Sequence, residues 1–519
     1  MKLVTPDQMR EMDRQTIEDI GVPGIVLMER AALGAVQALL EYLPEGAIGQ
    51  IGFLCGGGNN GGDGLAMARI VAEDGYQPVV ALLGDADSLR GEAAKNLEIV
   101  RNLDIPVVEL GDAEPDEVGD RLAELGYCLA WSDALLGTGL DREVEGRYAA
   151  GVEFLNRQPF VFSVDIPSGI NGSTGRVMGT AVEADATATF GEVKLGQALY
   201  PGRSHCGDLH VVDIGIPPHI SEDVGDGGEL LDEDWAFCRM SARPPDYHKG
   251  KSGELLIVAG SHEKTGAALL CARGALASGA GLVTVGTHAQ VIPRVATTIN
   301  EAMAAEMLSH TFDEHCQERL REFLPGLDAV AMGPGMGTSD GARQALEAVL
   351  ASDVPAAVFD ADALTILAGQ DDFTELRAFA ESSEAVLTPH PGEMARLCGC
   401  EIAEVLSDPV GLAEGLAKQT GAIVVLKMAA TVVAGPDGQL GINSNGNPGM
   451  ATGGVGDVLT GVIGARLAEG TEPAFDAVCL AVYAHGAAGD AAARDHGERG
   501  MGAVDLSEAL GAVWKRLEA

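Results

Sequence analysis

Short apolar runs separated by helix-length amphipathic segments recur along the whole chain. In the first half the runs are residues 48–55, 78–83, 107–110, 128–131 and 160–164, each as long as a buried strand. In the second half they are residues 253–260, 329–332, 356–359, 385–387 and 422–426. Residues 5–43 carry helical patterns that begin at Thr5-Pro6, and residues 458–467 predict a further helix. This alternation predicts the α/β fold class with parallel, doubly wound sheets.

One stretch, residues 219–234, departs from this alternation. It is acidic, contains glycines and shows no periodicity, which is typical of a linker. The 519 residues suffice for two or three well-filled domains. We therefore predict two domains, residues 1–220 and residues 229–519, joined by a linker at 221–228.

The charge balance narrows the possible partners and the compartment. The chain has 77 acidic and 34 basic residues, a net charge of −43, so we expect no nucleic acid partner and no anionic membrane partner. Acidic residues spread along the chain indicate a halophilic host. Nine scattered cysteines fit free thiols in a reducing cytosol. The N-terminus resembles no signal peptide, and no charge-free apolar run reaches the ~18 residues of a membrane span. We expect a soluble, cytoplasmic protein.

Polar residues in the first half follow predicted strands. Gly56, Gly58 and Gly61 match G-x-G-x-x-G between a strand and a helix, so a dinucleotide-binding dehydrogenase is one interpretation. The same turn, however, also contains side-chain oxygens at Asn59, Asn60 and Asp63, which a loop that only approaches pyrophosphate does not need. Later strands end at Asp133 and at Asp165-Ile-Pro-Ser168. Oxygen ligands converging at one sheet edge would suit an alkali cation and an acid–base carboxylate.

A glycine-rich turn in the second half, Thr452 to Asp457, opens the helix predicted at 458–467. Unpaired N–H groups at such a turn can bind an anion, and Asp457 is either a helix N-cap or a base that accepts a proton from an attacking hydroxyl. Four more elements fall at strand ends: His248-Lys249-Gly250 with Gly260-Ser261, Gly333 to Gly337, Thr388 to Glu393, and Lys427 to Thr431. The set predicts phosphoryl transfer without a P-loop.

The first-half motifs, residues 59–64, Asp133 with Gly137-Thr138-Gly139, residues 164–169 and Phe190 to Lys194, together resemble the NAD(P)HX epimerase (YjeF N-terminal) family over roughly residues 1–220. The resemblance implies a Rossmann-like three-layer αβα fold that interconverts the R and S forms of hydrated NADH and NADPH, with Asp165 as the acid–base residue. It implies potassium at Asn60, Asp133 and Ser168. The implied substrate-binding residues are Asn59, Asn60, Gly61, Gly62, Asp63, Gly137, Thr138, Gly139, Leu140, Asp141, Arg142, Glu143 and Asp165.

The second-half motifs resemble the ADP-dependent NAD(P)H-hydrate dehydratase (YjeF C-terminal) family, a ribokinase-like αβα fold, over about residues 229–519. The resemblance implies that ADP phosphorylates the hydrate hydroxyl and phosphate then leaves, with Asp457 as the catalytic base and Glu393 near Mg²⁺. The implied hydrate-binding residues are Ala267, Gly335, His390 and Asp457. The implied nucleotide-binding residues are Lys427, Met428, Ala429, Ala430, Thr431 and Gly456.

Together the two halves predict a bifunctional repair enzyme acting on NAD(P)HX and ADP, and we expect a homo-oligomer. Two alternatives remain open. A ribokinase-like small-molecule kinase could use the same Gly456-Asp457 site and leave the phosphate on its product. In the other, the first half is a non-catalytic Rossmann-like binding module, against which Asp133, Asp165 and Lys194 argue.

Overall fold

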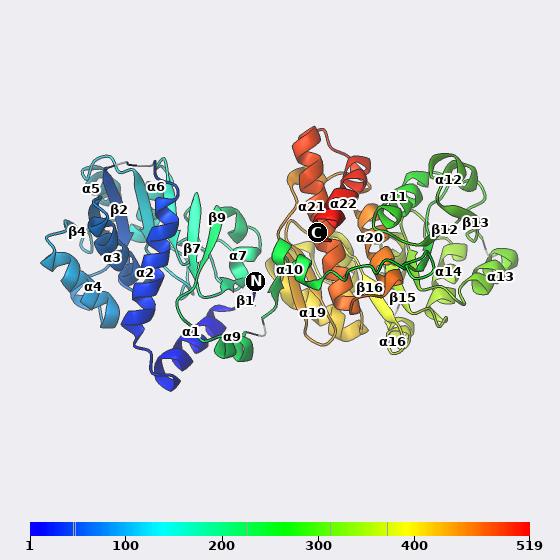
Figure 1. Ribbon diagram of the computed structural model, residues 1–519, viewed down its shortest axis with the longest axis horizontal. Coiled ribbons are helices and arrows are strands. Elements are labelled where there is room, and N and C mark those ends of the chain that lie inside the picture. The colour runs from blue at the N-terminus through cyan, green and yellow to red at the C-terminus, as the bar shows by residue number, and fades with distance from the viewer. Residues whose placement is uncertain (45, 47, 226, 312, 371, 519) are drawn as a thin grey trace. The chain divides into compact units, whose positions relative to one another are not determined.

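The computed structural model describes residues 1–518 except 45, 47, 226, 312 and 371, and Figure 1 shows its helices and strands. The chain divides into two compact units, Met1–Gly228 and Glu229–Ala519. Asp226 of the predicted linker and Ala519 at the end of the predicted second domain lie outside the described residues. Among the helices of the described residues, none is long and apolar enough to cross a membrane.

The first unit is built on a seven-stranded parallel sheet. Its strands, in spatial order, are β4 (Val107–Glu109), β3 (Gln77–Leu82), β2 (Gln50–Cys55), β5 (Ala130–Ala134), β6 (Val161–Val164), β7 (Ala186–Phe190) and β9 (Asp208–Val212). A separate two-stranded parallel sheet joins β1 (Leu3–Val4) to β8 (Val193–Lys194).

Helices cover both faces of this sheet because successive strand residues point to opposite sides. Ile51, Phe53 and Cys55 of β2 share one core with the helices of one face, whereas Leu54 packs in a different core with those of the other. The first group is α1 (Pro6–Arg14), α2 (Gly24–Leu40), α3 (Asn59–Glu73) and α4 (Gly91–Asn102), and the second is α5 (Pro115–Ala123) and α6 (Gly146–Leu155). Shorter pieces are η1 (Gln15–Asp19), η2 (Ala86–Ser88), α7 (Leu195–Ala198), α8 (Gly202–His205) and α9 (Pro218–Val224). The predicted α/β architecture is confirmed.

The second unit contains a ten-stranded sheet that is parallel except around β18, which runs antiparallel to both of its neighbours. In spatial order the strands are β10 (Glu229–Leu230), β19 (Leu440–Asn443), β18 (Thr431–Ala434), β17 (Ile423–Leu426), β16 (Glu384–Leu387), β15 (Ala356–Phe359), β14 (Ala329–Met332), β11 (Glu254–Val258), β12 (Leu282–Thr287) and β13 (Met303–Glu306).

One group of helices forms a continuous core with this sheet: α11 (Thr265–Ala277), α20 (Val455–Glu469), α21 (Ala474–His496) and α22 (Ala503–Leu517). A second group packs together through neighbouring pairs: α13 (Glu314–Phe323), α14 (Asp340–Leu350), α15 (Asp362–Ala368), α16 (Thr374–Ala380), α17 (Pro391–Cys398), α18 (Ile402–Ser407) and α19 (Pro409–Thr420). The remaining helices are α10 (Glu233–Arg239), α12 (Ile292–Thr298) and η3 (Pro448–Met450).

Regular elements occur within residues 219–234, the stretch without periodicity that we predicted to be a linker. This stretch contains most of α9, all of β10 and the start of α10. Its few apolar side chains decide the outcome, because Ile220 and Leu230 are buried in the folded units. The acidic composition of the stretch made these buried apolar residues difficult to recognise from the sequence.

Helices α11 and α20 pack closely against each other at Gly461. A Cβ atom added at Gly461 of α20 would lie 1.9 Å from the carbonyl oxygen of Cys271 in α11. We expect Gly461→Ala to lower the free energy of unfolding by about 1–3 kcal/mol through overpacking. Gly415 of α19 has open space around its Cβ position, so Gly415→Ala should instead raise stability by about 0.5–1 kcal/mol. Urea denaturation of both variants measures this difference, and equal effects would contradict the assigned packing.

Candidate functional site

A cavity of about 850 Å³ lies in the first unit where the carboxyl ends of β2, β5 and β6 meet the N-terminus of α3. Most of the substrate-binding residues predicted for this half line it: Asn59, Asn60, Asp63, Gly137, Thr138, Gly139, Leu140, Asp141, Arg142 and Asp165. Gly61, Gly62 and Glu143 do not line it. A Cβ atom at Gly61 would lie 2.0 Å from the Gly56 carbonyl oxygen, so this glycine permits the tight strand-to-helix turn.

Asp133 is fully buried beside this cavity and is held by a dense set of donors. The Ser168 hydroxyl donates to Asp133 Oδ1 at 2.6 Å, and the Ser168 amide donates to Asp133 Oδ2 at 2.8 Å. Ser163 adds a further bond to Oδ2 at 2.9 Å. Burial raises the pKa of Asp133, and these hydrogen bonds oppose that rise.

Asn60 lies close to Asp133 and Ser168, and its two side-chain polar atoms differ in their contacts. Its Nδ2 donates to the carbonyl oxygen of Leu136 at 3.0 Å, whereas its Oδ1 is buried and has no hydrogen-bond partner among the residues that the structure describes. The Leu136 carbonyl oxygen also lies 3.1 Å from the Ser168 hydroxyl oxygen. Asn60, Asp133 and Ser168, the predicted potassium ligands, are therefore brought together. An orphaned buried oxygen among such oxygens fits a hard cation.

Asp165 sits at the end of β6 with a backbone φ of +66°, an uncommon value for a residue other than glycine. Lys194 Nζ donates to Asp165 Oδ1 at 2.6 Å, and Gln197 donates to the Asp165 carbonyl at 2.8 Å. The Lys194 ammonium is fully buried and also donates to Thr189 and to the Phe190 carbonyl. These contacts aim the Asp165 carboxylate into the cavity.

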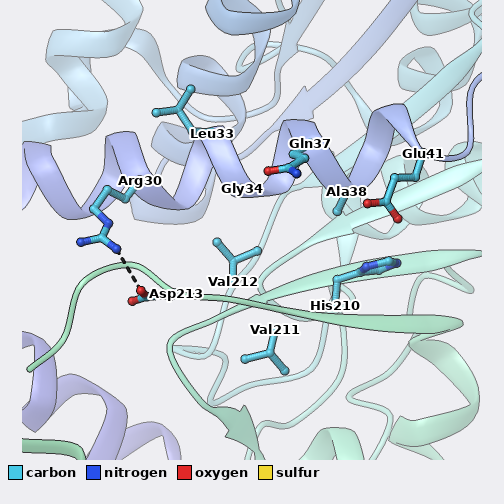
Figure 2. Close-up of a pocket in the computed structure, with 10 residues that line it drawn as sticks. All are labelled: Arg30, Leu33, Gly34, Gln37, Ala38, Glu41, His210, Val211, Val212 and Asp213. Atoms are coloured by element: carbon cyan, nitrogen blue, oxygen red, sulfur yellow. Dashed lines mark hydrogen bonds and ion pairs between the residues drawn. The ribbon is translucent and has the colours of Figure 1, made fainter. Parts of the chain in front are cut away.

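A second hollow in this unit, about 440 Å³ between α2 and the edge strand β9, contains none of the predicted site residues. Figure 2 shows its lining, including the ion pair between Arg30 and Asp213 at 3.0 Å. Its side chains present no convergent acids or amides comparable to those around Asp165.

In the second unit the catalytic candidate Asp457 lies in the first turn of α20. The N-cap of this helix is Gly454, with φ of +96°, and Asp457 is the third helical residue. The interpretation of Asp457 as only an N-cap is therefore wrong. Burial raises the pKa of Asp457 to about 6, and the negative charge of Asp360 adds to this while Lys427 opposes it.

Lys427, the first residue of the predicted nucleotide loop, is bonded to Asp360 and adjoins the start of α20. Lys427 Nζ donates to Asp360 Oδ1 at 2.6 Å, and the Lys427 amide donates to the Pro389 carbonyl at 2.8 Å. A Cβ atom at Gly456 would lie 3.5 Å from Lys427 Nζ, so these two predicted residues adjoin. Residues 427–431 form the turn from β17 into β18, where the Thr431 hydroxyl donates to the Met428 carbonyl at 3.3 Å.

Sequence reasoning missed two acids of this site, Asp360 and Asp362. The Thr460 hydroxyl donates to Asp360 Oδ2 at 2.7 Å, so both carboxylate oxygens of this buried residue are engaged. Asp362 pairs with Lys264 at 3.0 Å and accepts from the Gly337 amide at 2.9 Å. Between them Ala361 has φ of +47°, a strained conformation. Two acids directly after the strand predicted at 356–359 were the available signal.

Some of the remaining residues predicted for the second-unit site contact one another in the structure, and others lie far apart. Gly335, with φ of +60°, lies against Ala267, because a Cβ atom there would be 3.0 Å from the Ala267 Cβ. His390 caps α17: its Nδ1 accepts from the Gly392 amide at 3.0 Å, while Glu393 Oε2 accepts from the His390 amide at 2.8 Å. The expected grouping of His248-Lys249-Gly250 with Gly260-Ser261 is wrong, because they flank opposite ends of β11, roughly 16 Å apart along the strand.

Two family sequence models match the chain in tandem: YjeF-related protein N-terminus over residues 24–196, and NAD(P)H-hydrate dehydratase over residues 255–511. A bifunctional NAD(P)H-hydrate repair enzyme of Moorella thermoacetica is 38% identical over 100% of this chain and 97% of its own length. A protein of the same name from Thermofilum pendens is 38% identical over 98% of this chain and 95% of its own length. The chain belongs to the family of bifunctional NAD(P)H-hydrate repair enzymes.

The second unit of this family member also resembles a solved structure. An ADP/ATP-dependent NAD(P)H-hydrate dehydratase from Bacillus subtilis, co-crystallised with ATP and Mg²⁺, is 33% identical with a TM-score of 0.50. The match covers 56% of this chain and 99% of the Bacillus subtilis chain. The ribokinase-like fold predicted for this half is confirmed.

Proposed function

We infer that this chain repairs hydrated nicotinamide nucleotides in two reactions, epimerisation of NAD(P)HX in the first unit and ADP-dependent dehydration of the S form in the second. The observation that carries the inference is the combination of family membership over the whole chain with an aspartate–lysine ion pair at the carboxyl edge of each sheet. Fusion suits the chemistry, since one activity supplies the epimer that the other consumes.

In the first unit, Asp165 is the proposed acid–base residue. Inversion of the hydroxyl-bearing carbon requires proton transfer to and from oxygen as the ring carbon becomes planar, and an aspartate held in the cavity wall can exchange such protons. The bond from Lys194 orients this carboxylate. Residues 59–63 and 137–143 are the proposed surroundings of the hydrate.

In the second unit, Asp457 is the proposed base. It takes the proton of the hydrate hydroxyl while that oxygen attacks the terminal phosphoryl group of ADP, releasing AMP, and phosphate then departs with loss of the neighbouring ring proton. A pKa of about 6 suits a base that must be ionised near neutral pH yet able to accept a proton. The amides in the first turn of α20 are suited to binding an anionic phosphate group. Residues 427–431 and Gly456 are the proposed nucleotide contacts, and Ala267, Gly335 and His390 the proposed hydrate contacts.

Two cations complete the proposal. When bound, Mg²⁺ would neutralise phosphate charge, with Glu393 as a nearby carboxylate and the phosphates and water as its main ligands. Potassium would be held by Asn60, Asp133 and Ser168. We further propose a cytoplasmic homo-oligomer in a halophilic host, in keeping with the net charge of −43.

An assay with racemic NADHX and ADP tests both activities in one vessel. Wild type should convert all hydrate to NADH, followed by absorbance and by chromatography of the epimers. Asp165→Asn should slow epimerisation by ~10²–10⁴-fold and stop near half conversion, and Asp457→Asn should block NADH formation while the epimers still equilibrate. The exposed control variants Asp7→Asn and Asp437→Asn should behave as wild type. A stable phosphorylated product without NADH would instead identify a kinase.

Potassium binding has a readout that is independent of activity. At equal ionic strength, replacing choline chloride by KCl should stabilise the first unit by roughly 1–3 kcal/mol, as expected for a ligand well above its dissociation constant. Asn60→Ala removes the orphaned oxygen and should abolish this difference, whereas Asn102→Ala, an exposed control on α4, should keep it. Thermal unfolding monitors the effect. A potassium response that survives Asn60→Ala would contradict the proposed site.

A further inference from the structure

The N-terminal helix α1 and the π-helical turn η1 that follows it form one wall of the 850 Å³ cavity. Met9, Arg10, Asp13 and Ile17 line this wall. Their spacing places them along one helix face. A capping box between Thr5 and Gln8 fixes the start of the helix. π-helical turns are rare and are often found at functional sites.

Asp13 contributes the carboxyl group of this wall to the cavity. Within the described part of the chain, no hydrogen bond or ion pair holds its carboxylate, whereas Asp165, which lines the same cavity, is bonded to Lys194. The charges of Lys194 and Asp165 both act on Asp13, and the charge of Asp13 in turn acts on Asp63. Asp13, Asp63 and Asp165 thus share one enclosure with a single buried ammonium group.

These carboxyl groups differ in their surroundings. Burial raises the pKa of Asp13 to about 6; the Lys194 charge opposes this rise and the Asp165 charge adds to it. Asp63 is buried more completely, and its pKa is raised well above the ordinary value. Other charged groups belong to the same helix, to the cavity lining or to α9, which packs against α1. They are Arg10 and Arg14 of α1, Glu92, Asp141 and Arg142 of the lining, and the exposed His219, Glu222 and Asp223 of α9. Carboxyl groups in different surroundings within one cavity can divide acid and base roles.

The chemistry of epimerisation asks for two such groups. As the hydroxyl leaves the ring carbon, a carboxylic acid gives its proton to the departing oxygen, the C–O bond electrons go to that oxygen, and the ring nitrogen lone pair forms a planar C=N bond. Water then adds to the other face, and its surplus proton passes to a carboxylate. One proton is given and one is recovered, so the pair ends with the same total charge.

We propose that Asp13 is a second catalytic residue of the first unit, which exchanges one of these two protons with the hydrate oxygen while Asp165 exchanges the other. The proposal rests on the epimerase activity inferred above. The proton-sharing pair reverses its roles with each inversion, as a reversible reaction between two epimers requires.

The test is the rate of R-to-S conversion by the full-length Asp13→Asn protein, read by chromatography of the epimers. We expect kcat to fall by about 100-fold or more, with KM within a few-fold of wild type. The dehydration rate of S-NADHX and the thermal midpoint should not change. Asp19→Asn, the same substitution outside the cavity in η1, serves as the control and should leave all of these values at the wild-type level.

A pH profile separates proton transfer from a merely structural role. The singly protonated Asp13–Asp165 pair is the active form, and the group at about 6 loses its proton above that pH, so wild-type kcat/KM for epimerisation should fall as pH rises through this region. Asp13→Asn should lack this limb, and Asp13→Glu, which restores a carboxyl group, should regain both rate and limb even if the Asn variant folds poorly.

The outcomes are distinguishable. A wild-type chain that does not interconvert the epimers overturns the epimerase activity and, with it, the role of Asp13. An active wild type together with an Asp13→Asn variant of unchanged rate and pH profile overturns the role of Asp13 alone. A loss that the Asp13→Glu variant does not reverse at all also overturns it.

Discussion

Each site buries more carboxylates than ammonium groups, and the balance between them governs what the remaining acids can do. In the first unit Lys194 is bonded to Asp165, which leaves Asp13 and Asp63 without a full counter-charge. In the second, Lys427 is bonded to Asp360 and only partly offsets the burial of Asp457. Burial of an unpaired charge is costly, so the pKa of each of these acids is raised above its ordinary value. Burial with incomplete charge compensation thus gives these aspartates pKa values suited to proton transfer near neutral pH.

In each unit the charged residues lie at the carboxyl edge of the sheet, and unusual backbone conformations orient them. Asp165 directly follows β6 and has a positive φ, and Ala361 lies two residues after β15 with a positive φ between Asp360 and Asp362. Such conformations cost energy and persist where surrounding contacts enforce them. Here those contacts are the bonds to Lys194, Lys427 and Thr460. Strain, burial and ion pairing thus coincide at the carboxyl edges of both sheets.

Much of this arrangement could be predicted from the sequence, because apolar runs and strand-end motifs are local signals. The strands at 329–332 and 356–359 have the predicted bounds, and the motif residues of the first half gather around one cavity as expected. What could not be predicted depends on tertiary contacts. Asp13 lies in an amphipathic helix without any motif, and only the fold brings it toward Lys194. The antiparallel strand β18 was missed because short buried strands carry no mark of their direction.

Burial, together with the charges of Asp360 and Lys427, sets the proton affinity of Asp457, and the pKa of this residue tests that balance most directly. Carboxyl carbon NMR titration of ¹³C-labelled aspartate, assigned with Asp457→Asn, would follow this group in two further variants. Asp360→Asn removes a negative charge and should lower the pKa of Asp457 below about 6, whereas Lys427→Met removes a positive charge and should raise it. Shifts in the same direction, or no shift in either variant, would contradict the account.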